Sequence, residues 1–229
     1  MQPDEQWRAL KSEIERTVSL TSTTIVLGER EFTWYRVAEP DQLLEVAVTD
    51  AHVPAEELDP FWSVTWRAAQ GLDRFLGQYL DSALAGKRVL ELGCGSGQAG
   101  TGAAARGAIV TMTDAVPLAI QVAQLNAWPV AEQMQFLQLK WGSRALSEPR
   151  FPIVIGSDLV YDTSLFSQLE ACVRQHICDS GRLYLSEPYR HTGDLFSKWI
   201  VERGWQTCEH EFDLQDGRVP IRVFECWLR

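Results

Sequence analysis

The strongest constraint on the fold is a regular alternation of apolar runs with helical patterns, which begins near Gly71 and continues to the C-terminus. Short runs such as RVLELG and PIVIGSD have the length and composition of buried strands, and segments with helical spacing of apolar residues lie between them. Strands that alternate with helices join through right-handed crossovers and pair in parallel. The alternation therefore predicts an α/β, Rossmann-like fold with a mostly parallel seven-stranded sheet.

The two ends of the chain depart from this alternation. The last two strand patterns, WQTCEHEFDL and RVPIRVFECWL, are joined through a Gln-Asp-Gly turn and should form an antiparallel C-terminal hairpin. At the other end, apolar spacing predicts a helix over residues 1–20, and two β-rich runs flanking Gly28 predict a second hairpin. A proline-containing stretch from 54 to 60 has the composition of a linker. We expect residues 1–60 to be an extension that packs on a domain of residues 61–229.

Length and composition exclude several classes of protein. The chain has 229 residues, enough for one α/β domain with a short extension, and no apolar run approaches the roughly 18 residues of a membrane span. Its five cysteines are scattered and never form a C-x-x-C pair, and its four histidines lack the spacing of metal ligands. We therefore expect a cytoplasmic protein with neither a disulfide scaffold nor a bound metal.

The charge of the chain bears on its partner. The net charge is −10 and no basic run is longer than two residues, so a nucleic acid is not expected as a partner. An acidic surface suits a cationic substrate, but an ordinary soluble protein carries the same kind of surface to stay apart from its neighbours. Composition leaves the oligomeric state open.

The sharpest local signal is VLELGCGSGQAG, residues 89–100, in which a buried strand runs into Gly93, Gly95 and Gly97 and a helix begins after them. Glycines allow a tight turn and let a ligand approach the backbone closely. The N–H groups at the start of the following helix favour an anionic or polar ligand. This pattern predicts a cofactor site at the turn, although GSGQAG taken alone also fits the dinucleotide pattern G-x-G-x-x-G.

Two acidic residues separate the cofactors that such a turn can bind. Glu91 lies two residues before Gly93, where a carboxylate would repel a pyrophosphate but would pair with the amino group of a methionine moiety. Asp114 ends the next strand, where a carboxylate accepts hydrogen bonds from both hydroxyls of an adenosine ribose. An amino-acid tail joined to a ribose describes S-adenosylmethionine better than it describes NAD.

A second group of candidate residues follows the strand PIVIGSD. In an open parallel sheet, ligands bind outside the carboxyl ends of the strands, so Asp158 and Tyr161 should face the same crevice as the glycine loop. Simpler roles remain open for both residues. An Asp at the end of a strand often caps the following helix, and Tyr161 would serve equally as a core aromatic.

These motifs resemble those of a known family. The glycine loop resembles motif I of the class I methyltransferases. The D-x-x-Y tetrad of Asp158 and Tyr161, together with PFWSVTWRAAQGL and LKWG, resembles the methyltransferase-16 family and its relatives that act on the electron-transfer flavoprotein β subunit. The resemblance covers roughly residues 60–190 and implies an S-adenosylmethionine-dependent protein-lysine methyltransferase. It also implies that Trp66 and Trp141 flank the cofactor, with Trp141 near the adenine.

The implied reaction needs a neutral amine. A free lysine has a pKa of about 10.4, and an aromatic-lined channel that excludes water lowers this pKa. Asp158 has the opposite effect, so its expected catalytic role is to capture the cationic head beside the cofactor and aim it, while Tyr161 fixes its orientation. The extension is expected to cover part of the substrate groove. Two alternatives remain at this point: a small-molecule N- or O-methyltransferase, and a non-catalytic cofactor-binding adaptor.

Overall fold

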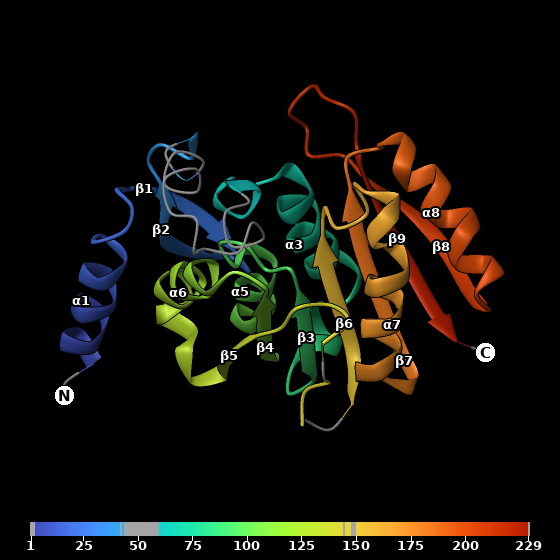
Figure 1. The fold of residues 1–229 in the computed structure, drawn as a ribbon, viewed down its shortest axis with the longest axis horizontal. Coiled ribbons are helices and arrows are strands. Elements are labelled where there is room, and N and C mark those ends of the chain that lie inside the picture. Colours follow the sequence, from blue (N-terminus) through green and yellow to red (C-terminus); the bar gives the residue numbers. More distant parts are fainter. Residues whose placement is uncertain (1–2, 42, 44–59, 144, 148–149, 229) are drawn as a thin grey trace.

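The computed structural model describes the chain except for residues 1–2, 42, 44–59, 144, 148–149 and 229 (Figure 1). The predicted linker from 54 to 60 therefore lies almost entirely outside the described residues. The N-terminal elements are α1 (Pro3–Ile14), β1 (Leu20–Leu27) and β2 (Arg30–Val37). The helices of the main domain are α3 (Arg67–Tyr79), α4 (Asp81–Leu84), α5 (Gln98–Ala105), α6 (Pro117–Asn126), α7 (Phe166–His176) and α8 (His191–Glu202).

The main sheet has seven strands in the order β5-β4-β3-β6-β7-β9-β8. Its strands are β3 (Arg88–Leu92), β4 (Ile109–Asp114), β5 (Met134–Gln138), β6 (Phe151–Ser157), β7 (Ile177–Glu187), β8 (Trp205–Phe212) and β9 (Ile221–Leu228). The pairs from β5 to β7 are parallel, whereas β9 is antiparallel to both β7 and β8. The predicted Rossmann-like sheet and its C-terminal hairpin are confirmed. The last strand of the chain, β9, lies between β7 and β8, so β8 forms the edge of the sheet (Figure 1).

The strand order creates a crevice at the centre of the sheet. After β3 the chain moves to one side through β4 and β5, and then returns to the other side with β6. The connections leaving β3 and β6 therefore diverge, and ligands bind at such a switch point outside the carboxyl ends of the strands. Helices α3, α5 and α6 contact one face of the sheet, while α7 and α8 pack on the other (Figure 1).

Helix α5 is built from small residues because it is covered on two sides. It contacts the sheet and α3 as well as β1, and seven of its eight residues are buried. A Cβ at Gly102 would lie 1.9 Å from Oδ1 of Asp73 on α3, and one at Gly28 in the N-terminal hairpin would lie 2.8 Å from Cβ of Ala105. A larger side chain at Gly102 would therefore displace α3, and one at Gly28 would displace the N-terminal hairpin from α5.

The N-terminal elements pack on α5 and α6, at the end of the molecule opposite β8 (Figure 1). The rings of Trp7 and Tyr35 lie 5.9 Å apart, and Ile14 and Val18 are buried against α6. The predicted helix ends at Ile14, well before residue 20. The residues after it include Thr17 and Val18, whose β-branched side chains disfavour helix, and the chain enters β1 at Leu20.

Candidate cofactor and acceptor site

A cavity of about 550 Å³ opens at the carboxyl ends of β3, β4 and β6. Its volume is within the range of small-molecule sites. It is lined by most of the predicted site residues, namely Trp66, Gly93, Gly95, Asp114, Trp141, Asp158 and Tyr161. The described lining also includes Phe61, Trp62, Gln98 and Lys140, which were not among the predicted site residues. Segments from residue 61 to residue 168 therefore converge on one site.

The glycine loop leaves no room for side chains. Gly93 and Gly95 have φ values of 57° and 52°, in the left-handed region that other residues seldom adopt. A Cβ at Gly93 would lie 2.7 Å from Cδ2 of Leu159, and one at Gly95 would lie 3.0 Å from the carbonyl oxygen of Trp62. Both glycines are thus required for the backbone to form the floor of the cavity.

Asp114 is positioned by the loop that it supports. Its Oδ2 accepts a hydrogen bond from the Gly95 N–H at 2.9 Å, and its Oδ1 accepts one from the Val116 N–H at 3.0 Å. The residue is 8% exposed and lines the cavity. Each carboxylate oxygen can accept a second hydrogen bond, so Asp114 can still receive two hydroxyl groups of a ligand.

Glu91 and Gly97 lie beneath the loop and are not among the described residues that line the cavity. The Glu91 side chain faces α5, where its Oε2 accepts a hydrogen bond from the Gly100 N–H at 3.1 Å. Burial, opposed by this hydrogen bond and assisted by the charge of Asp114, raises the pKa of Glu91 to about 8. A Cβ at Gly97 would lie 2.9 Å from Cβ of Ala123, so this glycine allows α5 and α6 to pack closely.

Aromatic side chains form the walls and the mouth of the cavity. Phe61 lies 6.1 Å from Trp66 and 6.3 Å from Tyr161, measured between ring centroids. The indole N–H of Trp66 donates to the Phe61 carbonyl at 2.9 Å. Phe61 is 53% exposed and Tyr161 is 41% exposed, so both belong to the mouth. Trp141 is more deeply placed, packing against the apolar cluster beneath β6 and lying near Gly93.

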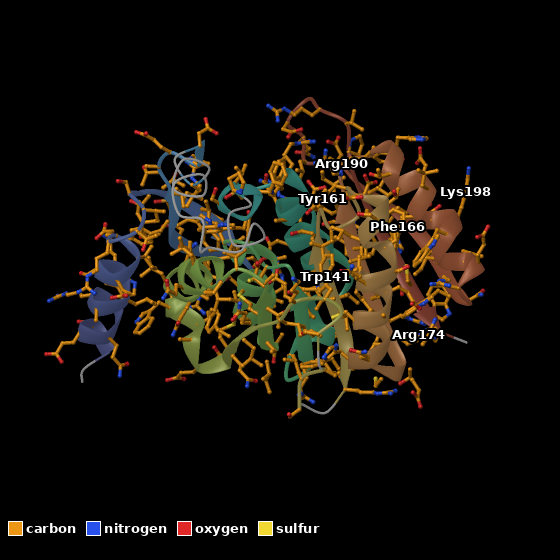
Figure 2. All side chains as sticks on the ribbon, viewed as in Figure 1. Trp141, Tyr161, Phe166, Arg174, Arg190 and Lys198 are labelled. Atoms are coloured by element: carbon orange, nitrogen blue, oxygen red, sulfur yellow. The ribbon has the colours of Figure 1, made fainter. Side chains whose placement is uncertain are left out.

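Asp158 is held by Arg190 from the end of β7. The Arg190 guanidinium donates from Nε to Asp158 Oδ1 at 3.0 Å and from Nη2 to Oδ2 at 2.9 Å. In the view of Figure 2, the labels of Arg190, Tyr161 and Trp141 follow one another from the top of the molecule to its centre. Asp158 has a φ of 56° and does not cap the next helix, because Asp162 accepts the hydrogen bond from the Ser164 N–H. Such backbone strain in a non-glycine residue is typical of functional sites.

Arg190 is the main residue of the site that sequence reasoning missed. The run EPYR ends the strand pattern GRLYLSEP, and the sequence predicts that it reaches the same edge of the sheet as a groove wall that could contact the substrate; it does not predict the pairing of Arg190 with Asp158. No spacing rule links it to Asp158, which lies 32 residues earlier. The available signal was that Arg190 follows one strand and Asp158 follows another, since opposite charges after neighbouring parallel strands can meet at the same edge of the sheet.

The described residues contain no group of three or more His, Cys, Asp and Glu side chains placed to hold a metal ion. Over the same part of the chain, no helix combines the length and the apolar character needed to cross a membrane.

Comparisons with known proteins identify the family. The model of a family described as lysine methyltransferase matches residues 53–199. The EEF1A lysine methyltransferase 3 of Mus musculus is 35% identical over 167 residues, which cover 69% of this chain and 69% of that protein. The histone-arginine methyltransferase METTL23 of Rattus norvegicus is 31% identical and is covered to 82%, as is this chain. The electron transfer flavoprotein beta subunit lysine methyltransferase of Xenopus laevis is 34% identical over 58% of this chain and 54% of that protein.

Solved structures show the same fold. The glycopeptide N-methyltransferase MtfA complexed with S-adenosyl-L-methionine has a TM-score of 0.60 at 17% identity, over 71% of this chain and 94% of that chain. The magnesium protoporphyrin IX methyltransferase ChlM from Synechocystis PCC 6803 with bound SAH has a TM-score of 0.58 at 19% identity, over 82% and 94%. Together with the family match, they show that this chain belongs to the lysine methyltransferase family and is an S-adenosylmethionine-dependent enzyme with the class I methyltransferase fold.

Proposed function

We propose that this protein methylates the side-chain amine of a lysine in another protein. The main support for the proposal is that a single cavity contains both halves of a methyl-transfer site. The glycine loop and Asp114 lie on one side of it, and Asp158 lies on the other side with the exposed aromatic residues of the mouth. The mouth includes Phe61 and Tyr161, and Val64 beside them is 39% exposed. An apolar rim of this kind suits a side chain presented by a protein surface.

The cavity fits S-adenosylmethionine. Asp114 is placed to accept the ribose hydroxyls, and the floor formed by Gly93 and Gly95 allows a ligand to lie against the backbone. Within the described chain, Oε1 of Gln98 and Oγ1 of Thr65 are buried without a hydrogen-bond partner, and both residues line the cavity. Buried polar atoms need partners, and the polar groups of the cofactor would supply them.

The predicted roles of the remaining residues follow from their positions. Trp141 is proposed to flank the adenine, and Trp66 and Asp158 to lie beside the methionine end of the cofactor. Glu91 and Gly97 are proposed to support the loop from beneath, through the hydrogen bond to Gly100 and the contact with Ala123. When bound, S-adenosylmethionine supplies an electrophilic methyl group and a sulfur leaving group that needs no protonation.

The residues of the acceptor side mainly orient the amine. A lysine that enters between Phe61 and Tyr161 leaves water behind, which lowers its pKa from about 10.4 and favours the neutral form. Asp158 and Tyr161 are proposed to direct the lone pair of the lysine Nζ towards the methyl group. The proton released from Nζ passes to water at the mouth. Orientation of two reacting groups can by itself supply a large part of the rate enhancement.

A specific observation also supports a second acceptor. Asp158 already binds a guanidinium through two hydrogen bonds, and the relative METTL23 is named as a histone-arginine methyltransferase. An arginine side chain from a substrate would present the same group. Arginine N-methylation is therefore the alternative that the test must separate from lysine methylation.

The test is incorporation of label from tritiated S-adenosylmethionine. The purified protein is incubated with a native cell lysate that retains its small molecules, and a blank without the protein is subtracted. We expect label in protein, and acid hydrolysis should release it as ε-N-methyl-lysine. Label in methyl-arginine would support the alternative acceptor, and label confined to small molecules would contradict both. Asp114→Ala is the matched control, because it should weaken cofactor binding without altering the acceptor side.

We also propose that the protein works in the cytoplasm. All five cysteines are free thiols, and three of them, Cys94, Cys172 and Cys226, are buried. Free thiols are the usual state in a reducing compartment. Fluorescence microscopy of the tagged protein, with fractionation as a check, would test this location.

A further inference from the structure

Arg190 is fixed between the acidic residue of the site and its aromatic wall. Its guanidinium makes two hydrogen bonds to the Asp158 carboxylate, and its Cζ lies 5.7 Å from the ring centroid of Trp66. The Asp158 side chain is 5% exposed, whereas that of Arg190 is 38% exposed. A paired charge in so buried a position is strongly favoured over an unpaired one.

The backbone holds Arg190 in this position independently of Asp158. Its N–H donates to Oε2 of Glu187 at 2.5 Å, and its carbonyl accepts a hydrogen bond from Nη2 of Arg222 at 3.4 Å. The preceding residue, Tyr189, has a φ of 55°, which a non-glycine residue adopts only when its surroundings impose it. The turn after β7 is therefore built to present Arg190 to the carboxyl edge of β6.

An unpaired carboxylate at this position would hinder methyl transfer to an amine. An opposite charge within about 4–6 Å commonly shifts a pKa by about 1–3 units towards the charged form. Asp158 alone would thus favour the lysine ammonium, which has no lone pair with which to attack. The bidentate contact with Arg190 makes the pair neutral while leaving its oxygens available as hydrogen-bond acceptors.

We propose that Arg190 is a positioning residue that cancels the charge of Asp158, so that the acceptor amine is oriented by the carboxylate without being held as an ammonium ion. This inference rests on the proposed function, because it concerns methyl transfer to a basic amine. The lysine ammonium loses one proton to water at the mouth, the lone pair of the resulting amine forms the new bond to the methyl carbon, and the carbon–sulfur bond breaks with its electron pair going to sulfur. Arg190 and Asp158 exchange no proton in this sequence.

The other charged groups around the pair do not perform this function. Glu187 on β7 is paired with Arg222 on β9 at 2.5 Å, and Arg222 also binds Asp194 on α8 at 2.7 Å. Burial and the neighbouring Glu211 on β8 raise the pKa of Tyr189 to about 12. Other titratable groups on the surrounding elements include Lys140 after β5, Tyr161 after β6 and Glu209 on β8. Cys94 after β3 and Asp114 at the end of β4 line the same cavity, Arg67 on α3 is paired with Asp216, and His191 begins α8. Arg190 is the cation that directly contacts the Asp158 carboxylate in the described chain.

The experiment is a pH profile of single-turnover methyl transfer with the cofactor saturating. The unaltered protein, Arg190→Gln, Arg190→Lys and the control Arg203→Gln are compared from about pH 6.5 to about pH 10. The readout is ε-N-methyl-lysine released from labelled lysate protein. Arg203 caps the C-terminal end of α8 and lies over the Trp199 ring, whereas Arg190 is at the opposite end of the helix, so the loss of Arg203 leaves the Asp158–Arg190 pair intact.

In Arg190→Gln we expect the midpoint of the profile to move up by about one pH unit or more. Each unit leaves about tenfold less neutral amine below the midpoint, so activity near neutral pH should fall about tenfold and recover at high pH. Arg190→Lys keeps the positive charge, and its midpoint should stay close to that of the unaltered protein. Removing both charges in Asp158→Asn/Arg190→Gln should bring the midpoint back, although the rate stays lower.

Three outcomes would overturn the inference. An equal loss of rate at every pH would make Arg190 a structural support, and a lower KM with an unchanged midpoint would make it a competitor of the substrate. If the midpoint of Asp158→Asn/Arg190→Gln moved up as far as that of Arg190→Gln, the shift would come from a group other than Asp158. None of these results affects the proposed function, which fails only if the unaltered protein places no label in lysine. Melting temperatures and S-adenosylhomocysteine affinities identify any variant that fails to fold.

Discussion

The cofactor side and the acceptor side of the cavity are built in different ways. On the cofactor side, backbone groups are the main partners: Asp114 binds the N–H groups of Gly95 and Val116, and Glu91 binds that of Gly100. On the acceptor side, contacts between side chains from distant segments dominate, as in the Asp158–Arg190 pair and the contact of Phe61 with Tyr161. The first arrangement is set by the course of the main chain, whereas single substitutions can change the second.

This difference predicts where a change affects binding and where it affects chemistry. Substitutions on the acceptor side should alter turnover and its pH dependence. Substitutions on the cofactor side should alter cofactor affinity or stability.

Asp158→Ala should lower turnover on the protein substrate by about a hundredfold or more, because the amine loses the group that orients it. Cofactor affinity should stay within about threefold, since its main determinants lie on β3 and β4. Single-turnover rates and S-adenosylhomocysteine binding by calorimetry measure the two effects. If the variant instead bound the cofactor weakly but kept its turnover at saturating cofactor, Asp158 would be a cofactor ligand and would not orient the amine. A comparison of melting temperatures separates either result from misfolding.

Asp114→Ala should weaken cofactor binding about tenfold or more, corresponding to roughly 1.5–3 kcal/mol for the loss of a charged hydrogen-bond partner. The same change leaves the N–H groups of Gly95 and Val116 without their acceptor, so the loop should also become less ordered. Calorimetric titration with S-adenosylhomocysteine is the measurement. Unchanged affinity would show that the carboxylate supports the loop without touching the ligand.

Asn126→Ala should destabilise the fold by about 1–3 kcal/mol, because the buried amide joins three backbone groups. Its Oδ1 accepts from the Tyr35 N–H, and its Nδ2 donates to the carbonyls of Tyr35 and Ser96.

Because these hydrogen bonds join the N-terminal hairpin to α6 and the glycine loop, we propose that residues 1–60 are an extension of the domain formed by 61–229 and not a separate unit. Thermal melting should show one transition at a lower temperature. Two separate transitions would contradict the proposal.

Glu91→Gln should change the pH dependence of stability more than activity. The pKa of Glu91 is raised to about 8 in the folded protein from 4.5, so the folded state holds a proton that the unfolded state has released between these values. Stability from this group is therefore present below about pH 4.5 and is lost as the pH rises through about 8. The variant should flatten this decline in melting temperature. A decline of equal slope in both proteins would assign it to other groups.

The described elements of the N-terminal extension pack on α5 and α6, and their apolar cluster includes Trp62 and Val116, which line the cavity. That residues 1–60 cover part of the substrate groove stays a prediction, since residues 44–59 lie outside the described residues. The described lining of the cavity begins at Phe61. The apolar stripe through Trp7, Ile14 and Val18 needed a partner surface, and α6 supplies it. An amphipathic pattern predicts that a face is buried, but it does not identify the surface that covers it.

The sequence by itself determined the features that depend on local periodicity and turn chemistry. The alternation of strands and helices predicted the parallel sheet, and the three glycines predicted the loop at the end of β3. Because parallel strands present their carboxyl ends at one edge, the placement of Asp114, Asp158 and Tyr161 around a single cavity also followed.

Only the tertiary structure decided which of these groups face each other. The Glu91 side chain points beneath α5 because alternate residues of a strand face opposite sides of the sheet, and its face is the one that α5 covers. The insertion of β9 between β7 and β8 depends on the packing of the whole sheet. The pairing of Arg190 with Asp158 depends on a strained turn after β7 that Glu187 and Arg222 hold in place. Local sequence patterns do not encode contacts between segments that only the folded sheet brings together.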